Sequence, residues 1–284
     1  MTISVENRSG YGKRRPAFTL IELLVVVAII GILAALILPA LAKSKSKAQG
    51  IYCFSNTRQL TLGWLLYADD HDGKFCPNRT NSIDSWVSGI LDFENIRTDN
   101  TNVQHLLNPK YAKLAPYINV AGIFKCPADK SVVSYGGHRL ARVRSFSMNH
   151  AVGGIEPPGR LPFGTGWMVY KKSAEILDPA PSKLWVLMDE HVDSIDDGRF
   201  IVDCESAGAS ARFVSFPAAT HNDSSSISFA DGHSEVHRWL DETTKYPVKY
   251  CGCLAHYASD ALYTEAPHSR DIAWLQQRTS GRLR

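Results

Sequence analysis

An uncharged apolar segment near the N-terminus constrains this chain more than any other feature. Residues 23–42 read LLVVVAIIGILAALILPALA, and none of these side chains is charged. As a helix that rises about 1.5 Å per residue, the segment would span roughly 30 Å, the thickness of the hydrocarbon core of a bilayer. The sequence therefore predicts one membrane-spanning helix. The mean hydropathy of −0.15 excludes a protein with many such spans.

The net positive charge lies entirely before this segment. The 284 residues include 31 basic and 28 acidic side chains, which gives a formal net charge of +3. Residues 1–17 contain Glu6 and four basic residues, so the 27 basic and 27 acidic residues that follow cancel. The weak overall charge predicts no nucleic-acid partner. The positive-inside rule places the N-terminus in the cytoplasm and everything after Lys43 outside it.

Two ordinary targeting segments fit this pattern, but neither explains Glu22. A secretory signal peptide would be cut at the small-x-small site Ala40-Leu41-Ala42, and a plain signal anchor would remain uncut. A carboxylate at the head of an apolar segment is costly and is by default functional. A third interpretation is needed to account for it.

The residues from Arg14 to Leu24, RRPAFTLIELL, supply that interpretation. They resemble the processing site of type IV prepilins and type II secretion pseudopilins. The resemblance implies that a prepilin peptidase cuts between Ala17 and Phe18 and methylates the new amino group. Ala17 stands where the family usually has Gly. Glu22 would become the fifth residue of the mature chain, where the family model pairs its carboxylate with the amine of a neighbouring subunit.

The helix is expected to continue outside the membrane. Residues 18–42 form the predicted transmembrane and assembly helix, and residues 43–70 its extracytoplasmic continuation. Apolar residues recur in that continuation at helical offsets: Cys53, Leu60, Trp64 and Tyr67. Three aspartates and a histidine at residues 69–72, followed by Gly73, predict its end, and they lack the spacing of an EF-hand calcium loop.

Residues 71–284 predict a loop-rich globular head. Short runs rich in β-branched and aromatic residues alternate there with turn signals. The candidate strands are residues 142–148, 183–188, 199–203 and 212–216. The predicted fold is therefore α+β, with a long N-terminal helix, membrane-spanning in its first half, packed on an antiparallel pilin-like head.

A β-hairpin is predicted at residues 226–238. Asp231-Gly232 is a preferred pair for a two-residue type I′ turn, which would fix the register of the two strands. In that register Ile227 opposes Val236, and both share the core face with Phe229.

The head also resembles a known bacterial group. His221, nine further residues and then Asp231-Gly232 are similar to an element that accompanies this N-terminus in a large family of pseudopilin-like proteins. Shorter similar pieces are residues 67–70, 125–129, 147–149 and 189–198. This resemblance supports the architecture more than an activity.

The head shows no motif of a known enzyme class, so we expect no catalytic activity. Its best constellation for a metal ion consists of carboxylates, which suit Ca²⁺, and imidazoles, which suit transition metals. The candidates are Asp189, Glu190, His191, Asp193, His221 and Asp231. The alternative is that these are hydrogen-bonded turn residues.

Six cysteines leave the disulfide pattern open, because they allow fifteen complete pairings. Cys53 and Cys126 lie in the family-like segments, and we expect them to pair. Cys251 and Cys253 flank one glycine in a segment expected to be extended, with separate partners. Reduced, buried thiols are the alternative.

The predicted function is a pseudopilin-like structural subunit of a type II secretion or type IV pilus-like filament. Its partners would be the prepilin peptidase, other pilin-like subunits and an inner-membrane assembly platform. The subunit would span the bacterial inner membrane once and then enter the filament. The alternative is a membrane-anchored exported enzyme or carbohydrate-binding protein that uses the Asp189 and His221 region.

Overall fold

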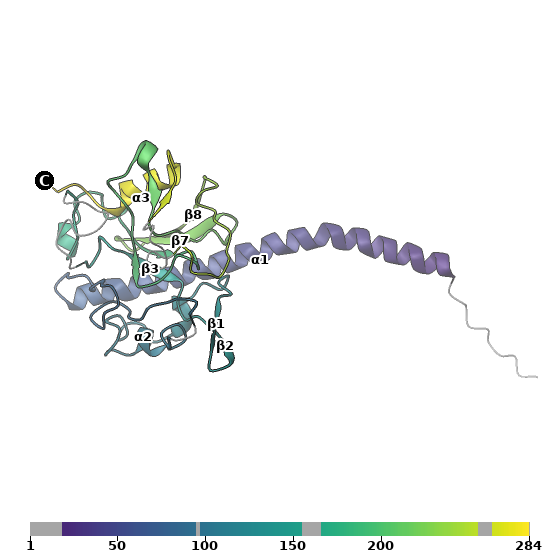
Figure 1. Cartoon of the computed structure of the whole chain (residues 1–284), viewed down its shortest axis with the longest axis horizontal. Coiled ribbons are helices and arrows are strands. Elements are labelled where there is room, and N and C mark those ends of the chain that lie inside the picture. Colours follow the sequence, from purple (N-terminus) through teal and green to yellow (C-terminus); the bar gives the residue numbers. More distant parts are fainter. Residues whose placement is uncertain (1–18, 95–96, 155–165, 255–262, 284) are drawn as a thin grey trace, which may run out of the picture. The chain divides into compact units, whose positions relative to one another are not determined.

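The computed structural model describes residues 19–94, 97–154, 166–254 and 263–283. The chain divides into two compact units, one ending at Ser44 and the other beginning at Lys45. Figure 1 colours the described chain from purple near the N-terminus to yellow near the C-terminus and labels several of its elements. The α-helices are α1 (Leu20–Asp70), α2 (Gln104–Leu107) and α3 (Arg270–Thr279), and the 3₁₀ helices are η1 (Ala121–Phe124), η2 (Ser173–Glu175) and η3 (Gly208–Ser210). The strands are β1 (Val132–Tyr135), β2 (His138–Ala141), β3 (Phe146–Asn149), β4 (Trp185–Asp189), β5 (Arg199–Phe200), β6 (Arg212–Phe213), β7 (Ser224–Phe229), β8 (Ser234–Arg238) and β9 (Thr264–Glu265).

Helix α1 confirms the predicted long helix. It ends at Asp70, the last residue of the predicted continuation. The stripe expected on its second half is buried at Cys53, Leu60 and Trp64. After the last turn, Gly73 has a left-handed φ of +74°, and its N–H donates to the carbonyl of Ala68 at 2.8 Å. Glycine adopts this left-handed conformation without steric cost. The helix therefore ends here, and the N–H of Gly73 pairs with one of its last carbonyls.

The main sheet of the head has five strands in the order β5-β3-β4-β7-β8. Neighbours are antiparallel except β3 and β5, so the sheet is mixed rather than wholly antiparallel. Each of the four predicted runs overlaps a strand. Strands β5 and β6 lie within their runs, whereas β3 and β4 begin later than predicted and end one residue beyond. Two small sheets, β1-β2 and β6-β9, complete the described strands.

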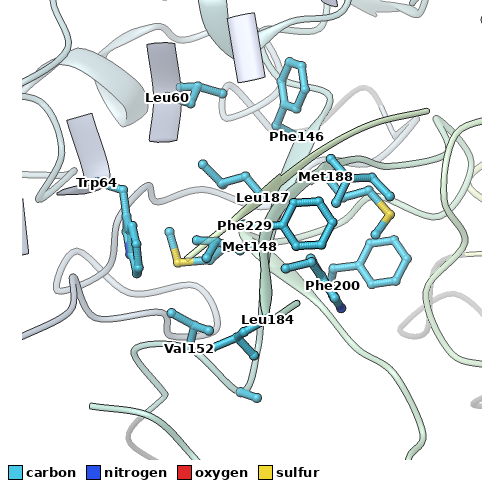
Figure 2. Packing of buried hydrophobic residues seen from close by; sticks show 14 of the residues in the cluster. Leu60, Trp64, Phe146, Met148, Val152, Leu184, Leu187, Met188, Phe200 and Phe229 are labelled. Carbon is cyan, nitrogen blue, oxygen red and sulfur yellow. The ribbon is translucent and has the colours of Figure 1, made fainter. Parts of the chain in front are cut away.

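The core of the head lies between the second half of α1 and the main sheet. Leu60 and Trp64 of α1 belong to one buried cluster with Met148 of β3, Leu187 of β4 and Phe229 of β7 (Figure 2). Burying one such large apolar side chain stabilises the fold by about 1.5–3 kcal/mol. The helix and the sheet therefore share one core.

The hairpin exists, but its predicted register was wrong by one residue. Ile227 opposes Glu235 instead of Val236, and Val236 is 49% exposed. The Asp231 carboxylate accepts a hydrogen bond from the backbone N–H of His233 at 3.1 Å, and of the turn residues only Gly232 has a positive φ. These features make a three-residue turn that ends in a left-handed glycine, not a two-residue type I′ turn.

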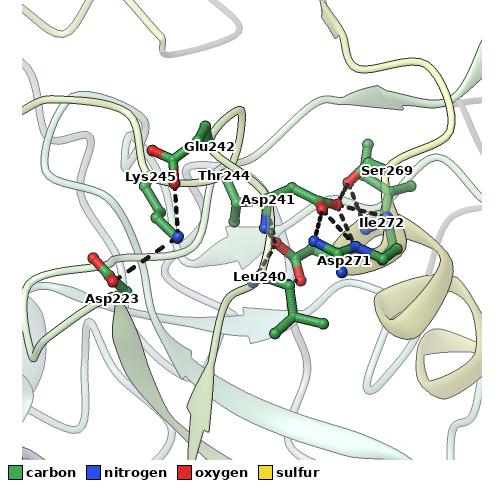
Figure 3. Close-up of polar contacts among 10 residues, drawn as sticks. Asp223, Leu240, Asp241, Glu242, Thr244, Lys245, Ser269, Asp271 and Ile272 are labelled. Carbon is green, nitrogen blue, oxygen red and sulfur yellow. Dashed lines mark hydrogen bonds and ion pairs between the residues drawn. The ribbon is translucent and has the colours of Figure 1, made fainter.

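Helix α3 is held at its N-terminus by carboxylates. Ser269 caps the helix by accepting from Ile272 N at 3.2 Å. The Asp271 carboxylate accepts from Leu240 N and from the Thr244 hydroxyl, and Asp241 accepts from Ser269 in return (Figure 3). Carboxylates at a helix N-terminus are favourable, because they pair free N–H groups and face the positive end of the helix dipole. The segment after β8 is thereby joined to α3.

Candidate functional site

Two side chains fix the start of α1. Glu22 N donates to Thr19 Oγ1 at 3.2 Å, and Thr19 N donates to a Glu22 carboxylate oxygen at 2.8 Å. This reciprocal capping box pairs two donors that the first helical turn leaves free, and Thr-x-x-Glu is its sequence signature. Glu22, predicted as an assembly residue, therefore also defines the helix start. The predicted processing residues, Ala17 and Phe18, lie outside the described residues.

The first half of α1 presents an exposed apolar surface. Leu20 is 79% exposed and Leu36 is 70% exposed. Among the described residues, α1 is the one helix long and apolar enough to cross a membrane, and none of its most apolar 18-residue window is buried. Large exposed apolar surfaces mark sites that contact lipid or other protein chains.

Four segments of the head bring two thiols, a carboxylate and an imidazole together. Cys53 lies on α1, Cys126 follows η1, Asp189 ends β4 and His221 precedes β7. Their ligand atoms all lie within 4.8 Å of one another, and all four residues are buried. Cys53 Sγ is 3.5 Å from Asp189 Oδ2, and Cys126 Sγ is 3.0 Å from His221 Nε2. We call these four residues the thiol cluster.

Neighbouring residues hold the thiol cluster in place. The backbone N–H of Cys126 donates to the Ser145 hydroxyl at 2.7 Å, next to the start of β3. A Cβ atom at Gly50 would lie 3.3 Å from the Cβ of His221, so the absent side chain leaves room for the imidazole against α1. The cluster is thus built by helix, sheet and loop together.

Burial favours the neutral forms of these groups. It raises the pKa of Asp189 to about 7 and also raises the pKa of Cys53. It lowers the pKa of His221. All three shifts have the same cause, because a charge is costly away from water. A bound cation would oppose this effect by stabilising the thiolate and the carboxylate.

Of the six predicted metal ligands, the structure places only Asp189 and His221 in the thiol cluster. Glu190 Oε1 instead accepts a hydrogen bond from the Ser194 hydroxyl at 2.7 Å. The His191 ring lies 3.0 Å from a backbone carbonyl oxygen. Glu190 and His191 follow the last residue of β4, and these contacts lie outside the thiol cluster.

The other two predicted ligands pair with backbone groups. Asp193 accepts from the N–H groups of Cys251 and Gly252, at 2.5 and 3.1 Å. Asp231, exposed in the hairpin turn, accepts from the backbone N–H of His233 at 3.1 Å and lies 2.6 Å from the ring nitrogen Nδ1 of the same residue. Both carboxylates thereby stabilise local turns.

The cysteines differ from the expected arrangement. Cys251 and Cys253 form a disulfide with each other, so separate partners were wrongly predicted for them. Gly252 has a φ of +64°, which turns the segment where an extended conformation was expected and brings the two sulfurs together. Cys53 and Cys126 are neighbouring free thiols in the structure.

A small cavity adjoins the thiol cluster. It has a volume of about 60 Å³, and its lining includes Cys126, Asp189, Thr220 and Tyr250. This volume exceeds the roughly 10–15 Å³ that one water molecule needs. The cavity is therefore large enough to hold water beside Cys126 and Asp189.

Comparison with known proteins identifies the N-terminal segment. Residues 12–38 match the family model described as the prokaryotic N-terminal methylation motif. No curated protein and no solved structure matches the chain. The match covers the capping box and much of the apolar half of α1, and it ends before the head. The chain thus carries the motif of type IV pilin-like proteins, which implies processing by a prepilin peptidase and assembly with other pilin-like subunits.

Proposed function

We propose that the chain is a pseudopilin-like structural subunit of a type II secretion or type IV pilus-like filament. One observation carries this proposal: the methylation motif at residues 12–38 overlies the exposed apolar half of a helix whose other half belongs to the core of a head. The subunit would first span the inner membrane with its N-terminus in the cytoplasm. An assembly platform would then move it into the filament, and the head would have a structural rather than a catalytic role.

The exposed apolar surface explains why such a subunit needs a partner. Each exposed leucine, such as Leu20 or Leu36, would gain about 1.5–3 kcal/mol by leaving water. A bilayer satisfies this requirement in the membrane-bound state. Packed helices of neighbouring subunits would satisfy it in a filament, because they remove the same surface from water.

Glu22 would give the subunits their register in the filament. After cleavage at Phe18, the methylated amine of one subunit would pair with the Glu22 carboxylate of its neighbour, because a charge in an apolar environment requires an opposite charge. The capping box gives Glu22 a second role. Replacing Glu22 with alanine would therefore remove both the capping box and the charge pairing. Glutamine can form the capping box but carries no charge.

The matched variants Glu22→Gln and Thr19→Ala separate these roles. Glu22→Gln should be cleaved normally and should enter filaments at least tenfold less than the unmodified chain. Thr19→Ala breaks the capping box and retains the charge, so it should assemble nearly normally. Immunoblots of sheared filaments measure both. Normal assembly of Glu22→Gln would exclude the proposed charge pairing.

The processing step is tested directly by the mass of the mature N-terminus. Expression with a prepilin peptidase should give a chain that begins with methylated Phe18. Ala17→Gly should be cleaved faster, since it restores the usual residue of the family. A mature chain that begins at Lys43, or an uncut chain that begins at Met1, would contradict the proposal.

A further inference from the structure

We propose that the thiol cluster, formed by Cys53, Cys126, Asp189 and His221, is a Zn²⁺ site inside the head. This inference goes beyond the filament proposal and does not depend on it. All four residues are described, and they belong to the compact unit that begins at Lys45.

The geometry fits a tetrahedral ion. Zinc binds sulfur at about 2.3 Å and nitrogen or oxygen at about 2.0–2.2 Å, so the ligand atoms of a tetrahedral site lie roughly 3.3–3.8 Å apart. In the cluster, the Cys53 sulfur lies 3.5 Å from the Asp189 carboxylate, and that carboxylate lies 3.9 Å from His221 Nε2. The Cys126 sulfur is 3.0 Å from the same nitrogen. Movements of less than about 1 Å would give the tetrahedron.

The donor atoms favour zinc over the hard ions calcium and magnesium. Two sulfurs, one imidazole nitrogen and one carboxylate oxygen are all ligands that zinc accepts in four-coordinate sites. Calcium and magnesium require mainly oxygen ligands, which this cluster does not provide. Because all four positions are protein side chains, the site would be structural rather than catalytic.

The placement of the ligands gives the ion a clear role. Cys53 comes from α1, Asp189 from the end of β4, and Cys126 and His221 from two separate loops. An ion bound by all four would join the helix to the sheet and to both loops. Because the unfolded chain does not preform such a site, the free energy of binding would add to the stability of the head.

A disulfide between Cys53 and Cys126 is the competing chemistry. The compartment proposed for the head permits oxidation, and a disulfide would remove both thiolate ligands. It would also leave the Asp189 carboxylate and the His221 imidazole buried beside an uncharged sulfur pair. A cation explains all four residues together, whereas a disulfide explains only two of them.

The test uses the full chain, purified in detergent without added reductant. It is loaded with Zn²⁺ and desalted, and its zinc is measured by elemental mass spectrometry. We expect about one zinc per chain. Cys126→Ser and His221→Ala should each bind zinc at least tenfold more weakly. Cys76→Ser and Cys204→Ser are the matched controls, because these free thiols are also buried but lie outside the cluster, and they should bind zinc normally.

Cobalt provides a readout that needs no variant. Co²⁺ bound to the unmodified chain should show the visible absorption of a tetrahedral ion and a thiolate-to-cobalt charge-transfer band, and added Zn²⁺ should remove both. Equal zinc content in the unmodified chain and in Cys126→Ser would overturn the proposal. So would a cobalt spectrum without thiolate bands, or a Cys53–Cys126 disulfide in the mass of the intact purified chain. N-terminal processing, measured on the same samples, reports separately on the filament proposal.

Discussion

The two halves of α1 share one backbone conformation and have opposite surroundings. Residues 20–44 belong to the N-terminal unit, and their large apolar side chains are exposed. From Lys45 onward, the helix has a buried face that includes Leu60 and Trp64. The second half is therefore stabilised by the core of its own chain, as most helices in folded proteins are. The first half depends on a different environment, which lipid or neighbouring subunits would provide.

The largest expected effect tests this contrast with one truncation in each half. Trp64→Ala should lower the free energy of unfolding of the head by about 3–5 kcal/mol, because it leaves a large cavity in the core. Leu36→Ala should change that free energy by less than about 0.5 kcal/mol. Urea unfolding followed by circular dichroism measures both. Equal losses from the two variants would show that the halves do not differ in this way.

The second test compares the starts of two helices. Asp271→Ala should destabilise the head by about 2–3 kcal/mol, because it leaves the buried Thr244 hydroxyl and two part-buried backbone N–H groups without a carboxylate partner. Thr19→Ala should leave the unfolding of the head unchanged, since its cap acts only on the first turn of α1. Asp271→Asn retains one acceptor oxygen and should lie between Asp271→Ala and the unmodified chain. A loss from Thr19→Ala as large as that from Asp271→Ala would contradict the contrast.

The sequence predicted well the features that depend on neighbouring residues. The apolar segment, the stripe through Cys53 and Trp64, and the stop at Gly73 are all read from local spacing, and α1 confirms them. Each of the four predicted strand runs overlaps a strand of the structure, because these runs too are read from neighbouring residues. Helix α3 was missed, although Ser269 before Ile272 and Leu275 gives both a cap and an amphipathic spacing.

Features that depend on distant residues could not be predicted in the same way. All four members of the thiol cluster were named from the sequence, but in two unrelated predictions, a disulfide and a metal site. Only the packing of α1 on the sheet places Cys53 beside Asp189, which lies 136 residues further along the chain. The hairpin register failed for a more local reason. Asp231 bonds to the N–H of His233, and this favours the longer turn.

A third test uses two glycines of α1. A Cβ at Gly63 would come within 2.6 Å of the Ile118 side chain, whereas a Cβ at Gly31 meets nothing within 4 Å. Alanine favours a helix by about 1 kcal/mol over glycine, and overpacking costs roughly 1–3 kcal/mol. Gly63→Ala should therefore destabilise the head by up to about 2 kcal/mol, and Gly31→Ala should not. Thermal unfolding of both variants checks this, and a stabilised Gly63→Ala head would show that Ile118 moves aside freely.

The smallest expected effect concerns charge at the edge of the head. Burial alone would raise the pKa of Asp241, but hydrogen bonds from Arg270 and Ser269 outweigh it and hold that pKa below its usual value of 3.8. The unfolded chain therefore binds this proton more readily than the folded chain. The resulting stabilisation is fully present above pH 3.8 and is lost as the pH falls through the lower folded value.

Asp241→Asn should accordingly cost less than about 1 kcal/mol at pH 7, since water screens this partly exposed group. The difference from the unmodified chain should shrink as the pH falls below 3.8. Glu242→Gln is the control, because Glu242 pairs with Lys245 at 2.9 Å but is 90% exposed, and its loss should have no measurable effect at any pH. Urea midpoints measured from pH 7 down to acid provide the comparison. A cost of Asp241→Asn that grows in acid would show that the carboxylate does not stabilise the head through its ionised form.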